Sequence, residues 1–407
     1  MPRLLNINSY HYRRGGADAV YFDHAALMAA HGWENAYFAM HHPQNQASPW
    51  SDYFVDELQL GHDYSMLQKG LMATKVIWSR EAQRKLERLI SEFKPDIAHL
   101  HNIYHHLSPS ILSTLAQAGI PVVLTAHDLK LACPSYSMFV NGQVCERCKG
   151  GNYFNAVAQR CVQGSAAASS IVALEAFTHR ALRSYRRHVD RIIVPSQFFR
   201  DKFVEWGWSP EPFEYIPNWL DVGAFAPRYE PGDYFLYFGR LSPIKGIETL
   251  IKASALAKTR LVIAGTGPSR DACEALARSL GCEVSFAGFR SGADLHDLIR
   301  GARATVLPSQ CYENAPLSIL EAAALGKPVI GSAIGGIPEL IKPGQTGWLF
   351  NTGDADSLAQ ILREVADAPG ERLSAMGRSA RAFVEGNFNQ SAYLARIEAL
   401  YSALMRQ

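Results

Sequence analysis

Short apolar runs alternate with longer amphipathic segments along most of the chain. The runs are about four or five residues long, which suits strands that are buried on both faces of a parallel sheet. Segments with helical periodicity follow them, which is the order expected of a doubly wound α/β fold. The predicted strands span residues 4–7, 97–100, 122–125, 191–195, 213–216, 234–238, 261–264, 284–287 and 304–307.

One interruption of this alternation divides the chain into domains. With 407 residues, the chain is long enough for two domains that each bury a core. A non-periodic stretch with two prolines, residues 217–227, is interpreted as the hinge. We predict a first domain over residues 1–217 and a second over residues 218–388. An amphipathic helix over residues 389–407 closes the chain.

Composition excludes several classes of protein. Hydrophobic residues make up 48% and charged residues 19%, which is unlike a disordered chain. Lys and Arg number 40 against 38 Asp and Glu, so the overall charge does not predict a nucleic-acid partner. No uncharged apolar run reaches the roughly 18 residues that span a bilayer. The apolar run at the amino end is too short for a signal peptide. We expect a cytoplasmic enzyme, with peripheral attachment to the inner face of a membrane left open.

Two glutamates near the end of the strand at residues 304–307 are the first candidate site residues. Glu313 lies in the polar loop after the strand, and Glu321 follows it in an Ala- and Leu-rich helix. A helix that starts near Ala315 or Pro316 places Glu321 near its second turn, so both carboxylates would face one cleft. The unpaired N–H groups of that helix would seat an anion or sugar hydroxyls. The alternative is that both are surface acids.

Two cations follow the first strand of the second domain. Arg240 offers a planar fork of donors, and Lys245 offers a mobile point charge just before a helix. A nucleoside diphosphate carries about two negative charges, so the pair would suit such a leaving group in place of a divalent ion. The alternative is a pair of surface cations flanking a turn.

The order Glu313, Asn314, Ala315, Pro316, Leu317 and then Glu321 resembles the C-terminal signature of family 4 retaining glycosyltransferases. The later Gly326, Lys327 and Pro328 and the Gly335, Gly336, Pro338 and Glu339 loop extend this match. The resemblance implies the GT-B fold, with two facing Rossmann-like domains and a final helix that returns to the first domain. It also implies that Glu313 lies by the donor sugar and that Glu321 binds the ribose hydroxyls.

The resemblance implies further site residues. His127, after the strand at residues 122–125, matches the histidine at the floor of the family's cleft, whereas His101 is left open between a site residue and a surface histidine. Glycines at two strand ends would let backbone approach the donor. The donor-binding candidates, beside the cations and glutamates above, are Gly15, Gly16, Gly265, Phe289, Arg290, Asn314, Ala315, Pro316 and Leu317. Phe289 is open between base contact and core.

The predicted function is transfer of a sugar with retention, with Glu313, His127, Arg240 and Lys245 as catalytic residues. The donor would be a UDP-sugar or GDP-mannose, and the acceptor a glycan or a lipid-linked glycan of surface polysaccharide biosynthesis. No catalytic cofactor is expected. A nucleotide-sugar epimerase of the same fold and a non-catalytic nucleotide-sugar-binding subunit are the alternatives.

Four of the seven cysteines cluster in an insertion over residues 129–165. Cys133, Cys145, Cys148 and Cys161 surround a Cys-x-x-Cys in a turn-rich stretch, which suits a closed, structural tetrahedral zinc site. Disulfides are less expected without a signal peptide, and free thiols are the third alternative. This insertion is the chief departure from the family pattern.

A basic stripe is predicted on a helix over residues 169–189. Arg180, Arg183 and Arg187 would share one side, and Ile171, Leu174, Ala181, Leu182, Tyr185 and Val189 would share the other. A solvated helix face is the simple interpretation. A docking surface for anionic lipids is the alternative, since family 4 enzymes often use lipid-linked acceptors.

Overall fold

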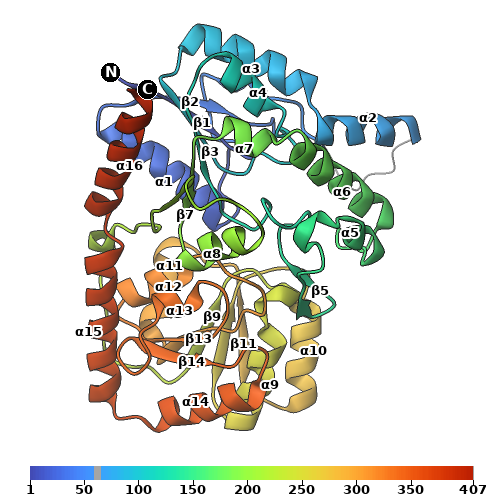
Figure 1. Ribbon diagram of the computed structural model, residues 1–407. Coiled ribbons are helices and arrows are strands. Elements are labelled where there is room, and N and C mark those ends of the chain that lie inside the picture. Colours follow the sequence, from blue (N-terminus) through green and yellow to red (C-terminus); the bar gives the residue numbers. More distant parts are fainter. Residues whose placement is uncertain (59–65, 407) are drawn as a thin grey trace.

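The computed structural model describes residues 1–58 and 66–406, which form two α/β lobes (Figure 1). Each lobe contains a six-stranded sheet in which neighbouring strands are parallel. The predicted α/β fold with two Rossmann-like domains is therefore confirmed. The predicted boundary at residue 217 falls between the last strand of the first sheet and the first strand of the second.

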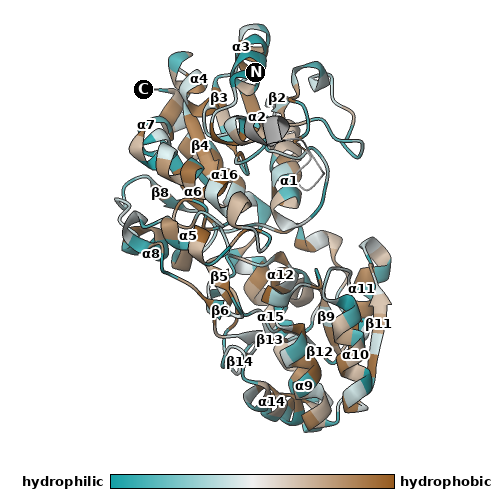
Figure 2. Ribbon diagram, turned by 90° about the vertical axis from the view of Figure 1, so that its right-hand side faces the viewer, coloured by the Kyte–Doolittle hydropathy of each residue, from teal (hydrophilic) through white to brown (hydrophobic). Residues whose placement is uncertain are grey.

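The first sheet has the strand order β2-β1-β3-β4-β7-β8. Strands β3 and β4 are buried at every position, which explains their continuous apolar runs, and Figure 2 colours both mainly as hydrophobic. The strands are β1 (Arg3–Ile7), β2 (Glu34–Phe38), β3 (Ile97–Leu100), β4 (Val122–Thr125), β7 (Arg191–Val194) and β8 (Phe213–Tyr215). The helices of this lobe are α1 (Gly16–Ala30), α2 (Met66–Ile77), α3 (Arg80–Phe93), α4 (Ile111–Gln117), α5 (Phe154–Ala158), α6 (Ala166–Ala181), α7 (Ser184–His188) and α8 (Gln197–Glu205).

The second sheet has the order β11-β10-β9-β12-β13-β14. Its strands are β9 (Phe235–Phe238), β10 (Leu261–Ala264), β11 (Val284–Gly288), β12 (Ala304–Leu307), β13 (Val329–Ser332) and β14 (Gly347–Phe350). The helices are α9 (Ile247–Ala257), α10 (Arg270–Leu280), α11 (Gly292–Gly301), α12 (Leu317–Ala324), α13 (Ile337–Leu340), α14 (Ala355–Asp367) and α15 (Gly370–Asn387). In both lobes the order of strands reverses direction near the middle of the sheet, which is where open α/β folds bind ligands.

Helix α16 (Gln390–Met405) leaves the second lobe and packs against the first, as the resemblance implied (Figure 1). Its buried residues Tyr393, Ile397, Tyr401 and Leu404 share one core with residues of β1, α1 and β3. The Tyr401 hydroxyl lies 3.0 Å from His24 Nε2 and 2.5 Å from His99 Nδ1. Buried polar groups must be paired, so this contact also fixes the register of α16 on the first lobe.

The single helix predicted over residues 169–189 is wrong. The structure has two helices, α6 and α7, and Arg183 between them adopts a left-handed conformation with φ 55°. The predicted apolar side is wrong as well, because Leu174 and Leu182 are exposed while Val172, Ala173, Glu175 and His179 are buried. Contacts with the cysteine-rich insertion and α2 decide which side faces inward, and the periodicity alone does not contain them.

The insertion over residues 129–165 contains little regular structure. It has two-residue strands β5 (Phe139–Val140) and β6 (Gln143–Val144), the short turn η2 (Lys149–Gly151) and α5. This agrees with the turn-rich composition of the segment. In the described part of the chain, no helix is both long and apolar enough to cross a bilayer.

We predict that the Tyr401→Ala substitution destabilises the protein by about 3–5 kcal/mol, as truncation of other large buried aromatic residues does. Tyr401 is 0% exposed, and its loss also leaves His24 and His99 without their hydroxyl partner. Urea unfolding measures the change. Met405→Ala, on the exposed side of the same helix, is the matched control and should change stability little. Equal effects of the two substitutions would show that α16 is not anchored as described.

Candidate functional site

Glu313 and Lys245 form the centre of the candidate site. Lys245 Nζ lies 2.5 Å from Glu313 Oε1, and the Ser309 hydroxyl donates to the same oxygen at 2.5 Å. Ser309 is fully buried, and its carbonyl accepts a hydrogen bond from the Ser332 hydroxyl at 2.7 Å. The loop after β12 is thus fastened to the loop after β9 and to the end of β13.

The two predicted cations lie on the same side of the site. Burial lowers the pKa of Lys245, but the Glu313 carboxylate outweighs this effect and raises the pKa above its ordinary value, so Lys245 stays charged. The charge of Arg240 also acts on Lys245, which places the guanidinium nearby. Arg240 is exposed, and in the described chain no acidic side chain forms an ion pair with it. Its donors are therefore available to an anionic ligand.

Close backbone contacts between loops require glycine at two positions. A Cβ on Gly265, which has φ 146°, would lie 1.9 Å from the Gly239 carbonyl oxygen, inside any allowed contact. A Cβ on Gly335, with φ 60°, would lie 2.4 Å from the Glu313 carbonyl oxygen. Gly265 therefore keeps the loops after β9 and β10 together, and Gly335 supports the backbone of Glu313.

Helix α12 presents its amino end to the first lobe. The helix begins at Leu317, with Pro316 as the capping residue and no side-chain hydrogen bond to its first N–H groups. Glu321 lies in its second turn, as predicted. Burial and the Asp23 carboxylate of α1 both raise the pKa of Glu321, so this residue faces the first lobe.

The glycine loop before α1 lies opposite α12. Gly15 and Gly16 are exposed, and a Cβ on Gly16 would lie 3.8 Å from Leu317 Cδ1. Asp18, in the first turn of α1, accepts hydrogen bonds from Asn8 at 3.0 Å and from Arg14 Nε at 3.1 Å. The structure thus brings the predicted glycine loop next to the first residue of α12.

Asn314 joins the two lobes directly. Its side chain accepts a hydrogen bond from Ser196 at 2.7 Å and donates to the Ala126 carbonyl at 2.8 Å. Glu339 adds a second link, because its carboxylate accepts from the backbone N–H groups of Gln197 at 2.9 Å and Phe198 at 2.7 Å. These N–H groups belong to the first turn of α8, where a carboxylate is favoured. The sequence motif does not reveal this role of Asn314.

His127 lies at the end of β4 in a column of aromatic side chains. Its Nε2 is 2.7 Å from His101 Nδ1, and the His101 ring stacks on His99 with a centroid distance of 4.7 Å. Burial lowers the pKa of His127 to about 4, so its ring is neutral at physiological pH. His101 is 1% exposed, so the interpretation of it as a surface histidine is wrong. His101 therefore sets the orientation of His127.

Phe289 and Arg290 lie in the loop after β11, at the edge of the second sheet. Phe289 is 70% exposed, so it does not belong to the core, and Arg290 is exposed too. Strands β10 and β9 separate β11 from β12, so this loop is farther along the sheet edge than the Glu313 loop. Both side chains remain free to contact a ligand that extends along that edge.

Asp128 and Tyr136 lie near residues that the sequence motifs identified, Asp128 directly after His127 and Tyr136 near Arg240. Burial raises the pKa of Asp128 to about 6, against the lowering effects of Tyr104 and Lys130. Tyr136, in the cysteine-rich insertion, is 47% exposed and lies close enough to Arg240 for that charge to lower its pKa against the effect of burial. The insertion thus reaches across to the second lobe. Tyr136 belongs to no sequence motif, so the sequence did not point to it.

Cys133, Cys145, Cys148 and Cys161 line one small cavity of about 10 Å³. Burial raises the pKa of Cys148 to about 12, and the other three thiols add to this rise. None of the seven cysteines, all within the described ranges, forms a disulfide. Across residues 1–58 and 66–406, no three His, Cys, Asp or Glu side chains are placed as a complete metal-binding group. The structure therefore brings the four cysteines to one cavity, but their side chains do not form a complete set of metal ligands.

Two parallel-sheet lobes and a last helix that returns to the first lobe define the GT-B class of fold. The family model "Glycosyltransferase Family 4" matches residues 14–223, and "Glycosyl transferases group 1" matches residues 224–383. The chain belongs to glycosyltransferase family 4.

Individual relatives agree with this assignment. A GDP-mannose-dependent monoacylated alpha-(1-6)-phosphatidylinositol monomannoside mannosyltransferase of Corynebacterium glutamicum is 29% identical over 238 residues, which is 52% of this chain and 62% of that protein. The sucrose-phosphate synthase structure from Thermosynechococcus elongatus has a TM-score of 0.72 at 22% identity, and 100% of both chains is covered. HepE of Anabaena in complex with UDP and glucose has a TM-score of 0.66 at 19% identity, covering 99% of this chain and 100% of that one. Because both structures are less than 25% identical to this chain, they support its fold and not a particular activity.

We predict that Asp128 makes stability depend on pH. Its pKa is about 6 in the folded protein against an ordinary value of 3.8, so the folded state binds the proton more tightly than the unfolded state. The contribution is fully present below the unfolded value and is lost as pH rises through about 6, by about 3 kcal/mol in all. Urea unfolding between pH 4 and 7 should show this loss in the wild type, and Asp128→Asn should lack it. Parallel pH profiles for the two proteins would contradict the assignment.

Proposed function

We propose that this family 4 glycosyltransferase moves a sugar from a nucleotide-sugar donor to a glycan or lipid-linked acceptor with retention of configuration. The observation that supports this most is the ion pair of Lys245 with Glu313 near the exposed Arg240, together with the position of α12, which carries Glu321, beside the glycine loop. A UDP-sugar is the first donor proposed, because HepE was solved with UDP and glucose. GDP-mannose is the second, because the Corynebacterium relative uses it.

The proposed chemistry depends on stabilising the departing diphosphate. Arg240 and Lys245 would neutralise its charge, in the role that a divalent ion has in other nucleotide-sugar enzymes. The open amino end of α12 would add backbone N–H groups. The C–O bond to the diphosphate breaks, the acceptor oxygen attacks from the same face, and the leaving diphosphate takes the acceptor proton. Retention then follows without a protein nucleophile.

The other candidate residues would position the donor. Glu313, held by Lys245 and Ser309, would orient the transferred sugar, and Glu321 would bind the ribose hydroxyls. His127 would contact the sugar with a neutral ring that His101 orients. Gly15, Gly16 and Gly265 would let backbone approach the diphosphate, and the loop with Phe289 and Arg290 would contact the base.

Two alternative functions use the same donor site. A nucleotide-sugar epimerase would convert the donor without an acceptor, and a non-catalytic subunit would bind the donor without releasing free nucleoside diphosphate. Product analysis after incubation with donor, with and without acceptor, separates the three. The ion pair between Lys245 and Glu313 beside an unpaired Arg240 favours catalysis, since a subunit that only binds donor has no need of charge aimed at a leaving group.

For the cysteine cluster we propose a structural zinc ion. The four thiols line one cavity whose volume is close to the 10–15 Å³ or so that a single water-sized occupant needs. Four thiolates would complete a tetrahedral site and leave no position for water, so the ion would stabilise the insertion and take no part in transfer. The sparse regular structure of residues 129–165 supports this role.

We predict that Glu313→Gln lowers turnover by about 100-fold or more while the fold and nucleotide affinity change little. The amide keeps the size of the side chain but loses the charge that holds Lys245 and orients the sugar. Release of nucleoside diphosphate measures turnover, and nucleotide titration measures affinity. Glu371→Gln, an exposed glutamate of α15, is the matched control. Wild-type turnover in Glu313→Gln would remove this residue from the mechanism.

We predict about one zinc atom per chain in protein purified without added metal. Cys145→Ser should lower the zinc content and the melting temperature together, because the ion would stabilise the insertion. Cys282→Ser, a cysteine outside the insertion, is the control and should keep the metal. Atomic emission and thiol titration make the measurement. Metal-free wild type with four reactive thiols in the insertion would exclude the site.

A further inference from the structure

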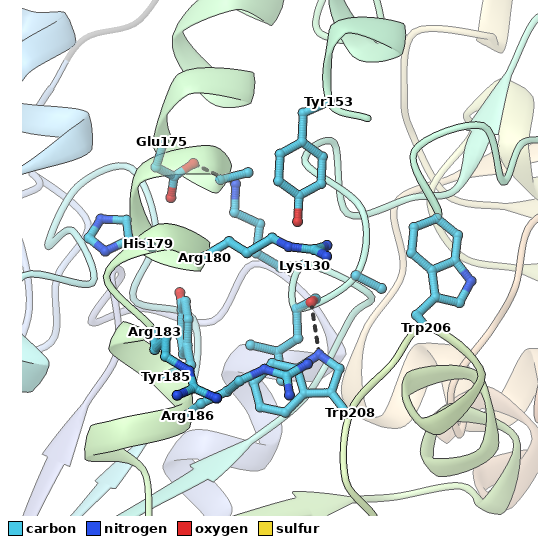
Figure 3. Close-up of a pocket in the computed structure, with 13 residues that line it drawn as sticks. Lys130, Tyr153, Glu175, His179, Arg180, Arg183, Tyr185, Arg186, Trp206 and Trp208 are labelled. Atoms are coloured by element: carbon cyan, nitrogen blue, oxygen red, sulfur yellow. Dashed lines mark hydrogen bonds and ion pairs between the residues drawn. The ribbon is translucent and has the colours of Figure 1, made fainter. Parts of the chain in front are cut away.

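A second hollow lies on the first lobe, apart from the crevice (Figure 3). Residues of α6, α7 and the end of α8 line it, together with Lys130 and Tyr153 of the cysteine-rich insertion. Its volume is about 70 Å³, several times the roughly 10–15 Å³ that one water molecule needs. It therefore has room for a small polyatomic group. We call it the arginine pocket.

Positive charge dominates the arginine pocket. Arg180, Arg183 and Arg186 line it, and in the described chain no Asp or Glu forms an ion pair with any of them. The single acidic side chain among its lining residues is Glu175, which is paired with Lys130 at 2.6 Å. Three guanidinium charges are therefore left without a counterion. All three residues are exposed, so an anion from solvent can reach their guanidinium groups.

Two of the three arginines are held in place. Arg180 donates to the Gly150 carbonyl at 3.0 Å and lies 5.9 Å from the Tyr153 ring centre. Arg186 donates to the Gly207 carbonyl at 2.6 Å and lies 4.5 Å from the Trp208 ring centre. Figure 3 shows the Arg180 guanidinium between Tyr153 and the lower wall of the hollow. Each guanidinium has five N–H donors, so most donors remain free for a ligand.

The pocket also contains buried donors without partners. The Tyr185 hydroxyl and Trp206 Nε1 are both buried and lack a hydrogen-bond partner, and Trp206 is 8% exposed. An indole N–H can only donate, and a phenol that keeps its proton can donate as well. Burial raises the pKa of Tyr185 well above its ordinary range, so the hydroxyl keeps its proton. Unpaired buried groups in native proteins call for a missing partner, and here that partner must be an acceptor.

The number and charge of these donors favour phosphate over carboxylate. A carboxylate carries one charge on two oxygens, whereas a phosphate monoester carries about −1.5 to −2 on three free oxygens. The three arginines come from α6, from α7 and from the residue between them, and together they offer more donors and charge than one carboxylate can use. Arginine forks match phosphate oxygens in pairs.

We infer that the arginine pocket is a binding site for a phosphate group, with Arg180, Arg183, Arg186 and the Tyr185 hydroxyl as its donors. The site is separate from the donor crevice, and it does not depend on the transfer reaction proposed above. Two sources share this chemistry: the head group of an anionic phospholipid and a soluble phosphoryl compound. Phe177 and Leu182 are exposed apolar side chains in the same stretch of chain as the arginines, and such side chains can insert into a membrane surface. The lipid source is therefore tested separately.

The structure alters the basic stripe expected on a continuous helix. Arg180 and Arg183 line the pocket, but Arg186 is the third member; Arg187 is as exposed as these three and does not line it. Arg187 is therefore a matched control one residue away from the site. Arg183→Gln removes a pocket charge that has no hydrogen bond to lose, and Tyr185→Phe removes only the unpartnered hydroxyl.

The first arm titrates inorganic phosphate by calorimetry in the Arg240→Gln background, which lacks the exposed cation of the crevice. Arg183→Gln should weaken binding by about tenfold or more, as expected for loss of a charge-assisted contact. Tyr185→Phe should weaken it by about fivefold, while its melting temperature stays equal or rises. Arg187→Gln should bind as the parent does. Equal phosphate affinities of Arg183→Gln and Arg187→Gln would overturn the inference. Phosphate would then be attracted by the general positive charge of this surface and not by a defined site.

The second arm measures sedimentation with phosphatidylglycerol-containing vesicles and with phosphatidylcholine vesicles. If Arg183→Gln no longer binds the anionic vesicles and Arg187→Gln still does, the phosphate group belongs to a phospholipid. Phosphate binding without such vesicle binding identifies a soluble phosphoryl compound. Absence of both overturns the site. Turnover of nucleotide sugar is followed separately, so failure of the transfer proposal and failure of the pocket give different results.

Discussion

The ion pair between Lys245 and Glu313 is the contact on which the rest of the site depends. Neither charge is fully exposed, with side-chain exposures of 25% and 13%, so each needs the other to offset its loss of hydration. The pair joins the loop after β9 to the loop after β12, and Ser309 and Ser332 continue the connection into the second sheet. A bound diphosphate would meet a lysine whose position and charge the protein has already set.

The same loop also joins the lobes. The residue after Glu313 is Asn314, whose amide reaches Ser196 and the Ala126 carbonyl of the first lobe. Glu339 and α16 add contacts on other sides. Ala126 directly precedes His127, so one short segment of the second lobe carries Glu313 and also contacts the segment that leads into His127. Movement of one lobe against the other would therefore change the site itself, as expected of a family whose crevice lies between two domains.

The cysteine-rich insertion connects features that are far apart in the sequence. Tyr136 reaches toward Arg240, and Gly150 and Tyr153 hold Arg180 in the arginine pocket. Between them, the four cysteines gather around one cavity. Although its regular structure is sparse, the segment makes backbone hydrogen bonds of its own, such as those from Leu129 N–H to the Tyr136 carbonyl and from Cys145 N–H to the Met138 carbonyl. The fold of this one segment therefore sets both the position of Tyr136 near Arg240 and one wall of the arginine pocket.

The sequence by itself determined the two-lobed fold and the family, and it pointed to the cations and glutamates of the candidate site. Buried parallel strands must be apolar throughout, so their runs are visible without a structure, and the spacing of Glu313 and Glu321 follows from local helix geometry. Only the tertiary structure decided which side of α6 is buried, that His101 lies beneath His127, and that Asn314 spans the lobes. Only it placed three arginines, a tyrosine and a tryptophan around one hollow. Each of these depends on contacts between segments distant in the chain, and periodicity and motifs record only neighbours in sequence.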